Sequence, residues 1–395
     1  MKRYKDILLV ARPDQSVDIY NALRRDGRLA YLYITFKLFP KWLSRIIRNK
    51  KLRCISGSYK ISYMTTLVNT LKYNLRLKCF ASCNENFWIE RLVAKATKHN
   101  QFKVMHYWPK YCHGDIIKKI KSTGTFTIAD IHMPNPNYVI DMMKGVYEKY
   151  GITADNTFLA KYSEEIKEHL ANEDNVMVPS SYVVETMKMT FPDKNYFVVP
   201  YGITVSSQYK RKSDITDASM VKNFVYAGKI SLEKGCDVLL EWFLQNSKYN
   251  IHLYGEIAHN QVRIFEKYKN VSNIIFHGVC PKNILQQELL RYDAGIHLSR
   301  FDAYSLAVGE IIGSGLPVIV SDVTGNKDDV LKYGFGLVTS LGVNEISEKI
   351  RLFVMPESYN RFIKNIDDYI NSRNETFGEQ TISFYKSIIG ESSKY

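Results

Sequence analysis

The chain has 395 residues, of which 45% are apolar and 24% charged, so we expect folded domains and not a disordered protein. The formal net charge of +14 favours an acidic partner, such as a phosphorylated substrate, an anionic membrane face or a nucleic acid, without choosing among them. No uninterrupted apolar segment of about 18 residues occurs, so no membrane span is predicted. The six cysteines form no Cys-x-x-Cys pair, which predicts a reduced cytoplasmic protein without a metal site.

The first half of the chain alternates between strand-like and helix-like patterns. Its first apolar run, residues 6–11, is too short for the core of a signal peptide and is followed by Arg12-Pro13-Asp14, so it predicts a buried strand. Further strands are predicted at 29–35, 102–108, 125–132, 175–180 and 195–200, and helices at 18–27, 85–99 and 180–191. Alternation of this kind predicts a parallel sheet covered by helices on both faces.

The segment 37–53, "KLFPKWLSRIIRNKKLR", interrupts this alternation. On a helix its apolar residues, Trp42 among them, fall largely on one side and its lysines and arginines on the other. That combination is typical of a helix lying in a membrane interface. The alternative is an amphipathic helix packed on its own sheet with solvated cations. We favour an anionic membrane surface as the partner of 37–53.

The second half repeats the alternation after the polar stretch "VVPYGITVSSQYKRKSDITDASMVKN". That stretch predicts a linker between two doubly wound α/β domains, 1–203 and 204–395, although the last helix could pack back on the first domain. The cleft between two such domains is the expected ligand site. Strands are predicted at 223–228, 249–255, 273–278, 294–299 and 316–322, and helices at 235–247, 283–292 and 304–315.

Two acids stand out in "SRFDAYSLAVGEIIGSGLPVIVSD", which begins at Ser299. Asp302 follows a strand and Glu310 lies inside the next helix. On one helix they would be separated by about 12 Å of rise, too far for a glycosidase pair held about 5 Å apart. Carboxylates accept hydrogen bonds from ribose and sugar hydroxyls, and a helix N-terminus binds phosphate. This arrangement predicts a nucleotide-sugar ligand.

A second cluster lies in "YAGKISLEKG", where Lys229 and Lys234 follow a strand and a glycine turn. Two cations at the carboxyl end of a strand can neutralise a diphosphate. The segment is not a P-loop, because GxxxxGK[ST] is absent.

These motifs together resemble the retaining glycosyltransferases of family 4, over about residues 100–345. The matching pieces are Gly228-Lys229 through Lys234-Gly235, Tyr254-Gly255-Glu256, His277-Gly278-Val279, "DAYSLAVGEIIGSGLPVIVSD", the linker "VVPYGI" and the preceding "VMVPSSYVVETM". The resemblance implies the GT-B fold, in which two Rossmann-like domains face each other across a cleft. It also implies transfer with retention and without a metal.

The resemblance implies a role for each matched residue. Lys229 and Lys234 hold the donor diphosphate, Glu310 holds the ribose, and Asp302 lies near the donor sugar. His132 in "TIADIHMP" matches a family histidine beside the transferred sugar, with His106 as its competitor. The candidate catalytic residues are His132, Lys229, Lys234 and Asp302, and the candidate donor-binding residues are Gly228, Gly255, Gly278, Val279, Tyr304, Ser305, Leu306 and Glu310. The backbone at Gly278 and Val279 would face the base, and that of Ser305 and Leu306 the phosphate.

Four departures from the family pattern bear on these roles. Asp302 replaces a glutamate, Lys229 an arginine that could bind in bidentate fashion, and Tyr304-Ser305-Leu306 the family's F-G-L. The N-terminal glycine loop is absent, since "ARPDQSVDIY" stands at 11–20. Structural alternatives are therefore kept: Asp302 as a helix cap, Glu310 as a satisfied core acid, and Lys234 and His132 as ordinary surface and structural residues.

The function predicted from the sequence is a metal-independent, retaining hexosyltransferase without a cofactor. It would move a sugar from a UDP-sugar or GDP-sugar to a hydroxyl of a lipid-linked glycan, in cell-surface polysaccharide or lipopolysaccharide O-antigen synthesis. We expect it in the cytoplasm, peripheral on the inner face of the plasma membrane. The alternatives are a non-catalytic scaffold or partner subunit of a transferase and a nucleic-acid-binding protein, for which no motif is present.

Overall fold

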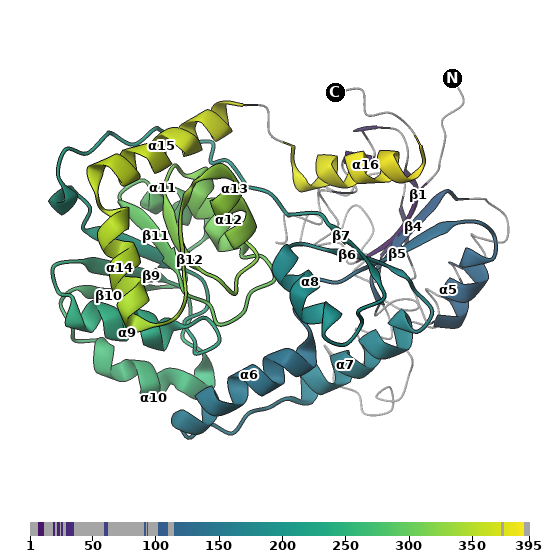
Figure 1. The fold of residues 1–395 in the computed structure, drawn as a ribbon, viewed down its shortest axis with the longest axis horizontal. Helices are drawn as coiled ribbons and strands as arrows, with labels where there is room; N and C mark the ends of the chain where they lie inside the picture. The colour runs from purple at the N-terminus through teal and green to yellow at the C-terminus, as the bar shows by residue number, and fades with distance from the viewer. Residues whose placement is uncertain are drawn as a thin grey trace, which may run out of the picture.

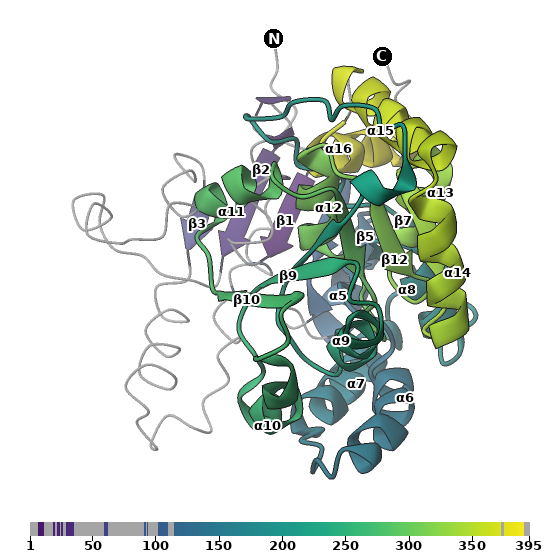
Figure 2. The ribbon, with the colours of Figure 1, turned by 90° about the vertical axis from the view of Figure 1, so that its left-hand side faces the viewer.

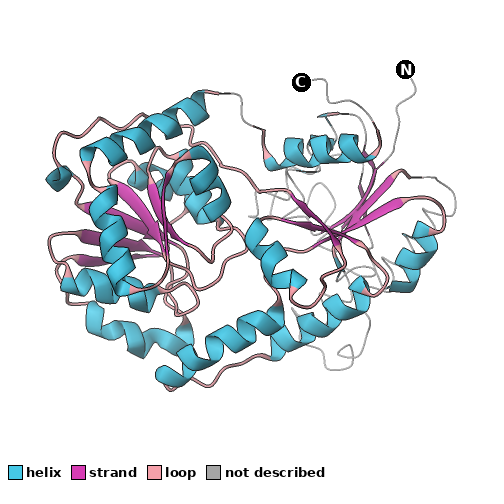
Figure 3. Cartoon of the chain, viewed as in Figure 1, coloured by secondary structure: helices cyan, strands magenta, loops and turns pink. Residues whose placement is uncertain are grey.

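The computed structural model describes residues 7–11, 19, 22–23, 25–26, 29–34, 59–61, 91, 93, 102–109, 114–372 and 375–390. These residues form two α/β units, each built on a parallel sheet with helices packed against it (Figures 1 and 3). The basic segment 37–53 lies outside the described residues, so its predicted membrane helix stays a prediction. No helix in the described part is long and apolar enough to cross a membrane.

The first sheet has the strand order β3-β2-β1-β4-β5-β6-β7, and every neighbouring pair is parallel. Parallel strands need a crossover between them, which explains the helical patterns found between the strand patterns. The order places β1 and β4 at the centre of the sheet. The strands are β1 Ile7–Ala11, β2 Leu29–Ile34, β3 Tyr59–Ile61, β4 Val104–Tyr107, β5 Phe126–Asp130, β6 Asn175–Val178 and β7 Asn195–Val198.

The helices of this unit include three that the sequence patterns did not single out: α5, α6 and α7. Helix α6 has Asn135 as its N-cap and Pro136 in its first turn, a signal that is visible in the sequence. The described residues within the predicted helices 18–27 and 85–99 are helical apart from the turn residue Asp26. The fully described helices are α5 Gly114–Lys121, α6 Pro136–Lys149, α7 Thr157–Leu170 and α8 Ser181–Lys188.

The second sheet has the order β10-β9-β8-β11-β12-β13 and is also parallel. All five predicted strands are present, and β13 is an addition at the edge. The strands are β8 Asn223–Ala227, β9 Asn250–Tyr254, β10 Ile274–Gly278, β11 Ala294–His297, β12 Val318–Ser321 and β13 Gly336–Thr339. The helices are α9 Cys236–Gln245, α10 Val262–Phe265, α11 Lys282–Leu289, α12 Leu306–Gly313, α13 Lys327–Tyr333, α14 Val343–Phe353 and α15 Pro356–Asn371, with 3-10 turns at Ala218–Met220, His259–Gln261 and Glu266–Tyr268.

Two helices pack on the unit to which they do not belong in sequence. Helix α16, Phe377–Ile388, follows the second sheet but buries Phe377, Ile382 and Tyr385 in the core of the first (Figure 1). Helix α6 precedes the linker but buries Val139 and Met143 in a core of the second unit, below which it lies in Figure 2. The two units are therefore interlocked.

The linker also packs closely on the second unit, against α12. A Cβ on Gly313 would lie 2.0 Å from the Thr204 carbonyl oxygen, so only glycine allows this approach. The Ser206 amide donates to the Gly313 carbonyl at 2.9 Å. Helix α12, which carries Glu310, thus packs directly on the linker backbone.

Candidate functional site

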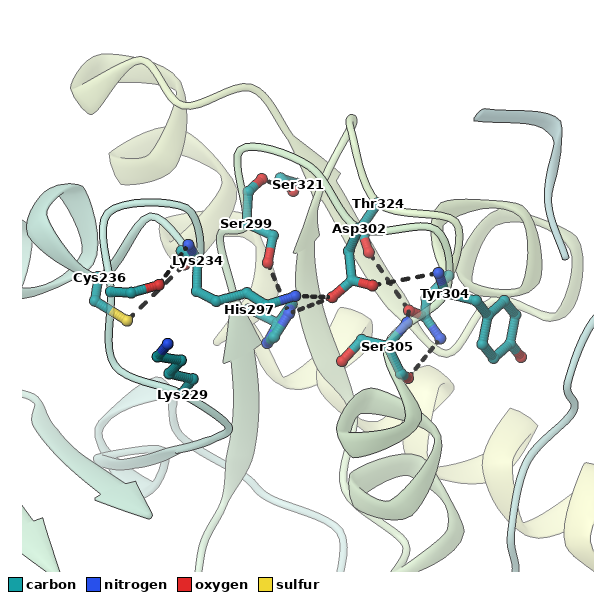
Figure 4. A network of polar contacts seen from close by, with 12 residues as sticks. Lys229, Lys234, Cys236, His297, Ser299, Asp302, Tyr304, Ser305, Ser321 and Thr324 are labelled. Atoms are coloured by element: carbon teal, nitrogen blue, oxygen red, sulfur yellow. Dashed lines mark hydrogen bonds and ion pairs between the residues drawn. The ribbon is translucent and has the colours of Figure 1, made fainter. Parts of the chain in front are cut away.

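Lys234 and Asp302 meet at the carboxyl edge of the second sheet, where ligands bind in folds of this kind (Figure 4). The Lys234 ammonium lies 2.5 Å from Asp302 Oδ2, and the two side chains are 29% and 13% exposed. Asp302 Oδ1 accepts from the Tyr304 amide at 3.3 Å, whereas the N-cap of α12 is Ser305. Asp302 therefore shapes the loop before the helix instead of capping the helix.

The Asp302 carboxylate is charged despite its burial. Burial by itself raises the pKa of Asp302, but His297 and Lys234 outweigh that effect and lower it to about 2. A carboxylate that stays ionised can accept hydrogen bonds from hydroxyl groups over the whole physiological pH range. The site thus combines a fixed negative charge with a partly exposed ammonium.

Lys229 lies on the same loop as Lys234 and points away from Asp302 (Figure 4). Its backbone carbonyl accepts from the Tyr226 hydroxyl at 2.7 Å, and its side chain is exposed. Among the residues that the structure describes, none forms an ion pair with the Lys229 ammonium. A diphosphate in this loop would meet one cation without a partner and one that is paired with Asp302.

Helix α6 anchors the Lys234 loop from the other unit. The Tyr147 hydroxyl donates to Glu233 at 2.6 Å and the Tyr150 hydroxyl to Asp237 at 2.9 Å. The Arg300 guanidinium binds both oxygens of buried Asp237, at 2.5 and 2.8 Å. The residues on either side of Lys234 are thus fixed, which leaves the lysine side chain as the movable part of the loop.

The predicted glycines serve different purposes. A Cβ on Gly255, which has φ 151°, would lie 1.8 Å from the Gly228 carbonyl oxygen, so the packing of the two loops requires this glycine. Gly228 has φ 143°, a backbone conformation that other residues rarely adopt. Gly278 has φ 70°, and its carbonyl accepts from the Gly255 amide at 2.8 Å. Val279, which follows, is 75% exposed, so the chain is open to a ligand there.

The structure changes the role expected of the Ser305 amide. That amide donates to the Asn326 side-chain oxygen at 2.7 Å, and the Asn326 amide group donates back to the Ser305 carbonyl at 3.2 Å. The Tyr304 hydroxyl binds the Asp329 carboxyl. Leu306, the first residue of α12, is 60% exposed, and the first amides of a helix have no acceptor within it. A phosphate would find its donors from Leu306 onward, not at Ser305.

Glu310 has a partner that the sequence did not reveal. The carboxylate is 17% exposed and binds the ammonium of Lys282, the first residue of α11, whose side chain is 59% exposed. Glu310 is therefore at the surface of the site and is not a satisfied core acid. A ribose would compete with Lys282 for this carboxylate.

His132 lies on the first unit, with both ring nitrogens facing protein groups. Nδ1 is 2.5 Å from the Tyr201 hydroxyl and Nε2 is 3.3 Å from Asp130 Oδ2. Asp130 also accepts from Trp108 at 3.0 Å and binds His106 at 2.9 Å. Burial raises the pKa of Asp130, but the two histidines and Trp108 together lower it.

The two candidate histidines differ in exposure. His132 is 20% exposed, whereas His106 is fully buried between Asp130 and Tyr385. His132 is thus the one of the two that can face a cleft. In this structure its ring nitrogens would have to release Tyr201 or Asp130 to bind a substrate.

Tyr201, in the linker, joins the two halves of the site. Besides meeting His132, its ring packs edge-on against Tyr304 at 5.4 Å. The Ser180 hydroxyl of the first unit donates to the Ala303 carbonyl at 2.7 Å, so α8 also contacts the loop that carries Asp302. The structure thus joins Lys234, Asp302, Tyr304 and Ser305 in one network of contacts. Tyr201 connects this network to His132. Glu310 lies outside the network and is paired with Lys282.

A cavity of about 480 Å³ lies on the linker side of Tyr304. Its lining includes Pro200, Asp329 and Glu375 together with Tyr304, one of the predicted donor-binding residues. Since neither lysine of the loop nor Glu310 lines it, the cavity borders the predicted donor site only at Tyr304.

Sequence reasoning missed several residues of the site. Asp130 could have been predicted as a site residue, because it stands at the end of a predicted strand, two positions before His132. His297, which ends a strand five residues before Asp302, could have been found in the same way. Asn326, Tyr201 and Lys282 could not, since each contacts a residue more than twenty positions away in sequence.

Residues 209–368 match the family described as Glycosyl transferases group 1. The matched region contains Lys229, Lys234, Asp302 and Glu310. A search of curated protein sequences finds no match to the chain.

Solved structures share the whole architecture. A sucrose-phosphate synthase from Thermosynechococcus elongatus has a TM-score of 0.67 and 16% identity, covering 98% of this chain and 100% of its own. WaaG, a glycosyltransferase involved in lipopolysaccharide biosynthesis, has a TM-score of 0.57 and 12% identity, over 96% and 99% of the chains. The Anabaena protein HepE, solved with UDP and glucose, has a TM-score of 0.59 and 12% identity, over 97% and 100%.

These likenesses confirm the predicted fold, two parallel-sheet α/β units in the GT-B arrangement. At such low identity they bear on the fold alone. The group 1 match and the shared fold together support a glycosyltransferase of the GT-B class.

Proposed function

We propose that this protein is a metal-independent, retaining glycosyltransferase that moves a hexose from a nucleoside diphosphate donor to a hydroxyl group. The proposal rests on the ion pair of Lys234 with Asp302 beside Lys229, which has no ion-pair partner among the described residues, all inside the group 1 region. Two ammonium groups and a carboxylate that is ionised near neutral pH, on neighbouring loops, suit a charged diphosphate attached to a sugar rich in hydroxyls.

The donor would lie along the carboxyl edge of the second sheet. The base would rest on the open backbone at Gly278 and Val279, and the ribose hydroxyls on Glu310. The diphosphate would form ion pairs with the ammonium groups of Lys229 and Lys234 and accept hydrogen bonds from the first amides of α12. A base held by backbone contacts could be that of UDP or of GDP, and HepE was solved with UDP and glucose.

The chemistry rests on leaving-group stabilisation and positioning. The bond between the anomeric carbon and the diphosphate oxygen breaks, and the acceptor oxygen forms its bond to that carbon on the same face. The acceptor's hydroxyl proton passes to the departing diphosphate, whose negative charge the two lysines stabilise. Asp302 and, on the facing unit, His132 would orient the sugar.

For the acceptor we propose a lipid-linked glycan of a cell-surface polysaccharide or of lipopolysaccharide O-antigen. WaaG, a protein of similar fold, is involved in lipopolysaccharide biosynthesis. The basic segment 37–53 would hold the enzyme on the anionic inner face of the plasma membrane, where such an acceptor is anchored.

A non-catalytic GT-B scaffold is the second candidate. It is favoured by two observations: no glycine loop stands at 11–20, and the two ring nitrogens of His132 face the protein groups Tyr201 and Asp130. Such a scaffold would bind nucleotides weakly or not at all and would not release sugar from a donor.

Binding of UDP, GDP, ADP, CMP and dTDP, followed by thermal shift and calorimetry, tests the proposal. We expect one base to be preferred, and Lys229→Ala to weaken binding by about tenfold or more through loss of a charge-assisted contact. Lys144→Ala, an exposed lysine on α6, is the matched control. Absence of binding to every nucleotide would favour the scaffold, and binding without release of sugar from UDP-glucose or GDP-mannose would argue against catalysis.

A further inference from the structure

His297 is a buried histidine directly beneath the Lys234–Asp302 pair, and the function proposed above does not use it (Figure 4). It ends β11 and is 2% exposed. Its ring stacks on Tyr226, with 5.4 Å between centroids and 7° between planes. Because the Tyr226 hydroxyl is itself bound to the Lys229 carbonyl, the plane of the imidazole is fixed by the loop that carries both lysines.

The contacts of its two nitrogens differ. Nε2 is 2.9 Å from the Ser299 hydroxyl and 3.5 Å from Asp302 Oδ2. Nδ1 is buried and has no hydrogen-bond partner among the residues that the structure describes. An ionised carboxylate can only accept, so the tautomer that suits this site carries its proton on Nε2, facing Asp302.

Asp302 Oδ2 is thus shared by two groups, of which Lys234 is nearer, at 2.5 Å against 3.5 Å. A donor diphosphate carries more negative charge than one carboxylate and would draw the flexible Lys234 ammonium toward it. Asp302 would then be a nearly buried charge without its cation, which is costly unless another donor takes over. His297 Nε2, 3.5 Å away, is close enough to take over with a small movement of the carboxylate.

Resting on the proposed function, we propose that His297 is a positioning residue that holds the Asp302 carboxylate toward the donor sugar once Lys234 has turned to the diphosphate. It would compensate for the short side chain of Asp302 by fixing the carboxylate from below. Ser299, whose carbonyl is bound by the Ser321 hydroxyl at 2.6 Å, keeps the imidazole from turning away.

The protonation of His297 follows from the same contacts. The titratable groups that face His297 are Asp302, Lys234 and Tyr226. Burial lowers the pKa of His297 most, Asp302 raises it, and Lys234 lowers it further. A second proton would have to go on Nδ1, which is buried and has no acceptor among the described residues. We therefore expect His297 to stay neutral, with its proton on Nε2, before and after the donor binds.

The test compares His297→Gln, which keeps a donor amide near the Nε2 position, with His297→Leu, which fills similar space without a donor. The probes are UDP and GDP for affinity, and release of sugar from UDP-glucose and GDP-mannose for turnover. We expect both variants to bind the diphosphates within about threefold of the wild type. Turnover should fall by about 10–100-fold in His297→Leu, as for a lost hydrogen bond to a charged group, and only a few-fold in His297→Gln.

Rescue by His297→Gln is the readout that a purely structural role would not give, because glutamine restores a donor without restoring the imidazole. Calorimetry in buffers of different ionisation enthalpy tests the tautomer: proton exchange on binding UDP or GDP should be the same in the wild type and both variants, and uptake seen in the wild type alone would overturn it. Equal turnover in all three proteins or equal losses in both variants would overturn the role of His297. If His297→Leu does not fold, a loss of more than about tenfold in His297→Gln overturns it. A wild type that binds neither diphosphate removes the proposed function as well, whereas binding with unaffected variants removes this inference alone.

Discussion

Asp302 and Glu310 are two carboxylates of one short segment with different electrostatic partners. Asp302 is paired with Lys234 and supported by His297, inside the interface of the two units. Glu310 is paired with Lys282 at the edge of the site. In the absence of a donor, each acid thus forms an ion pair with a lysine. A nucleotide sugar would break both ion pairs, because its hydroxyl groups would bind the acids and its phosphates would bind Lys234.

Replacing Glu310 with Gln should lower the turnover of a nucleotide sugar by about 10–100-fold, since the ribose would lose hydrogen bonds to a charged acceptor. Folding should be little affected, because the Lys282–Glu310 pair is largely exposed on the lysine side. Steady-state kinetics and thermal denaturation measure the two effects. Glu348→Gln, on the exposed face of α14, is the control, and normal turnover in Glu310→Gln would refute the ribose assignment.

Asp302 should make stability depend on acidity. Its folded-state pKa of about 2 lies below the ordinary 3.8, so its contribution is fully present above about pH 4 and is lost as the pH falls toward 2. The shift corresponds to about 2 kcal/mol. The difference in unfolding free energy between wild type and Asp302→Asn, measured from pH 5 downward, should shrink across this window. A difference independent of pH would contradict the ion pair.

At the scale of elements, α6 and the loop after β8 form the support for the diphosphate lysines. Tyr147 and Tyr150 reach from α6 to Glu233 and Asp237, one on each side of Lys234. Arg300, just after β11, completes the support by binding both Asp237 oxygens. The loop is thus held by an element of the facing unit as well as by its own.

Replacing Arg300 with Ala should destabilise the protein by about 3–5 kcal/mol, because buried Asp237 would lose its cation. Chemical denaturation measures the loss. The matched control is Arg291→Ala, which removes a 73% exposed arginine paired with Glu288 and should cost at most about 1 kcal/mol. Equal effects of the two substitutions would show that the Asp237 pair does not support the loop.

At the scale of the molecule, the two units exchange helices. Helix α16 completes the core of the first sheet from the C-terminal end of the chain, and α6 contributes to a core of the second. Neither sheet keeps its full core if the chain is divided at the linker. We therefore expect the whole molecule to unfold in a single cooperative transition, despite its two-domain appearance.

Tyr385→Ala is the test of this interlocking. Tyr385 is 1% exposed and its hydroxyl meets His106 of the first sheet, so its loss should cost about 3–5 kcal/mol. The unfolding midpoint should fall as one transition, followed by both tryptophan fluorescence and circular dichroism. Phe158→Ala, at a 68% exposed position, should change stability by less than about 0.5 kcal/mol. Separate transitions in Tyr385→Ala would show that the units are independent.

Much of the fold could be predicted because its signals are local. The run at 223–228 is largely apolar and aromatic and the run at 316–322 is centred on Val-Ile-Val, so each predicts a buried strand from its own residues. β3 and β13 were not predicted, because neither forms an apolar run: β3 is three residues with Lys60 at its centre, and β13 has only Leu337 and Val338 between Gly336 and Thr339. Helices α5 to α7 were not singled out, although Asn135-Pro136 is a recognisable helix-start signal for α6.

The candidate site divides in the same way. The spacing of Asp302 and Glu310 and the glycine turn before Lys229 could be predicted, because they depend on residues that are neighbours in sequence. The Asn326 side chain that occupies the Ser305 amide and the lysine that pairs with Glu310 were not, because each comes from another loop.

The sequence by itself determined the alternation of strands and helices, the parallel sheets and the residue types that can bind a nucleotide sugar. These follow from periodicity and from the chemistry of side chains along one stretch of chain. Tertiary structure alone decided which charges pair, which amides remain open, and that α6 and α16 cross between the units. Such contacts join residues far apart in sequence, and their free energy depends on burial and distance, which exist only after the chain has folded.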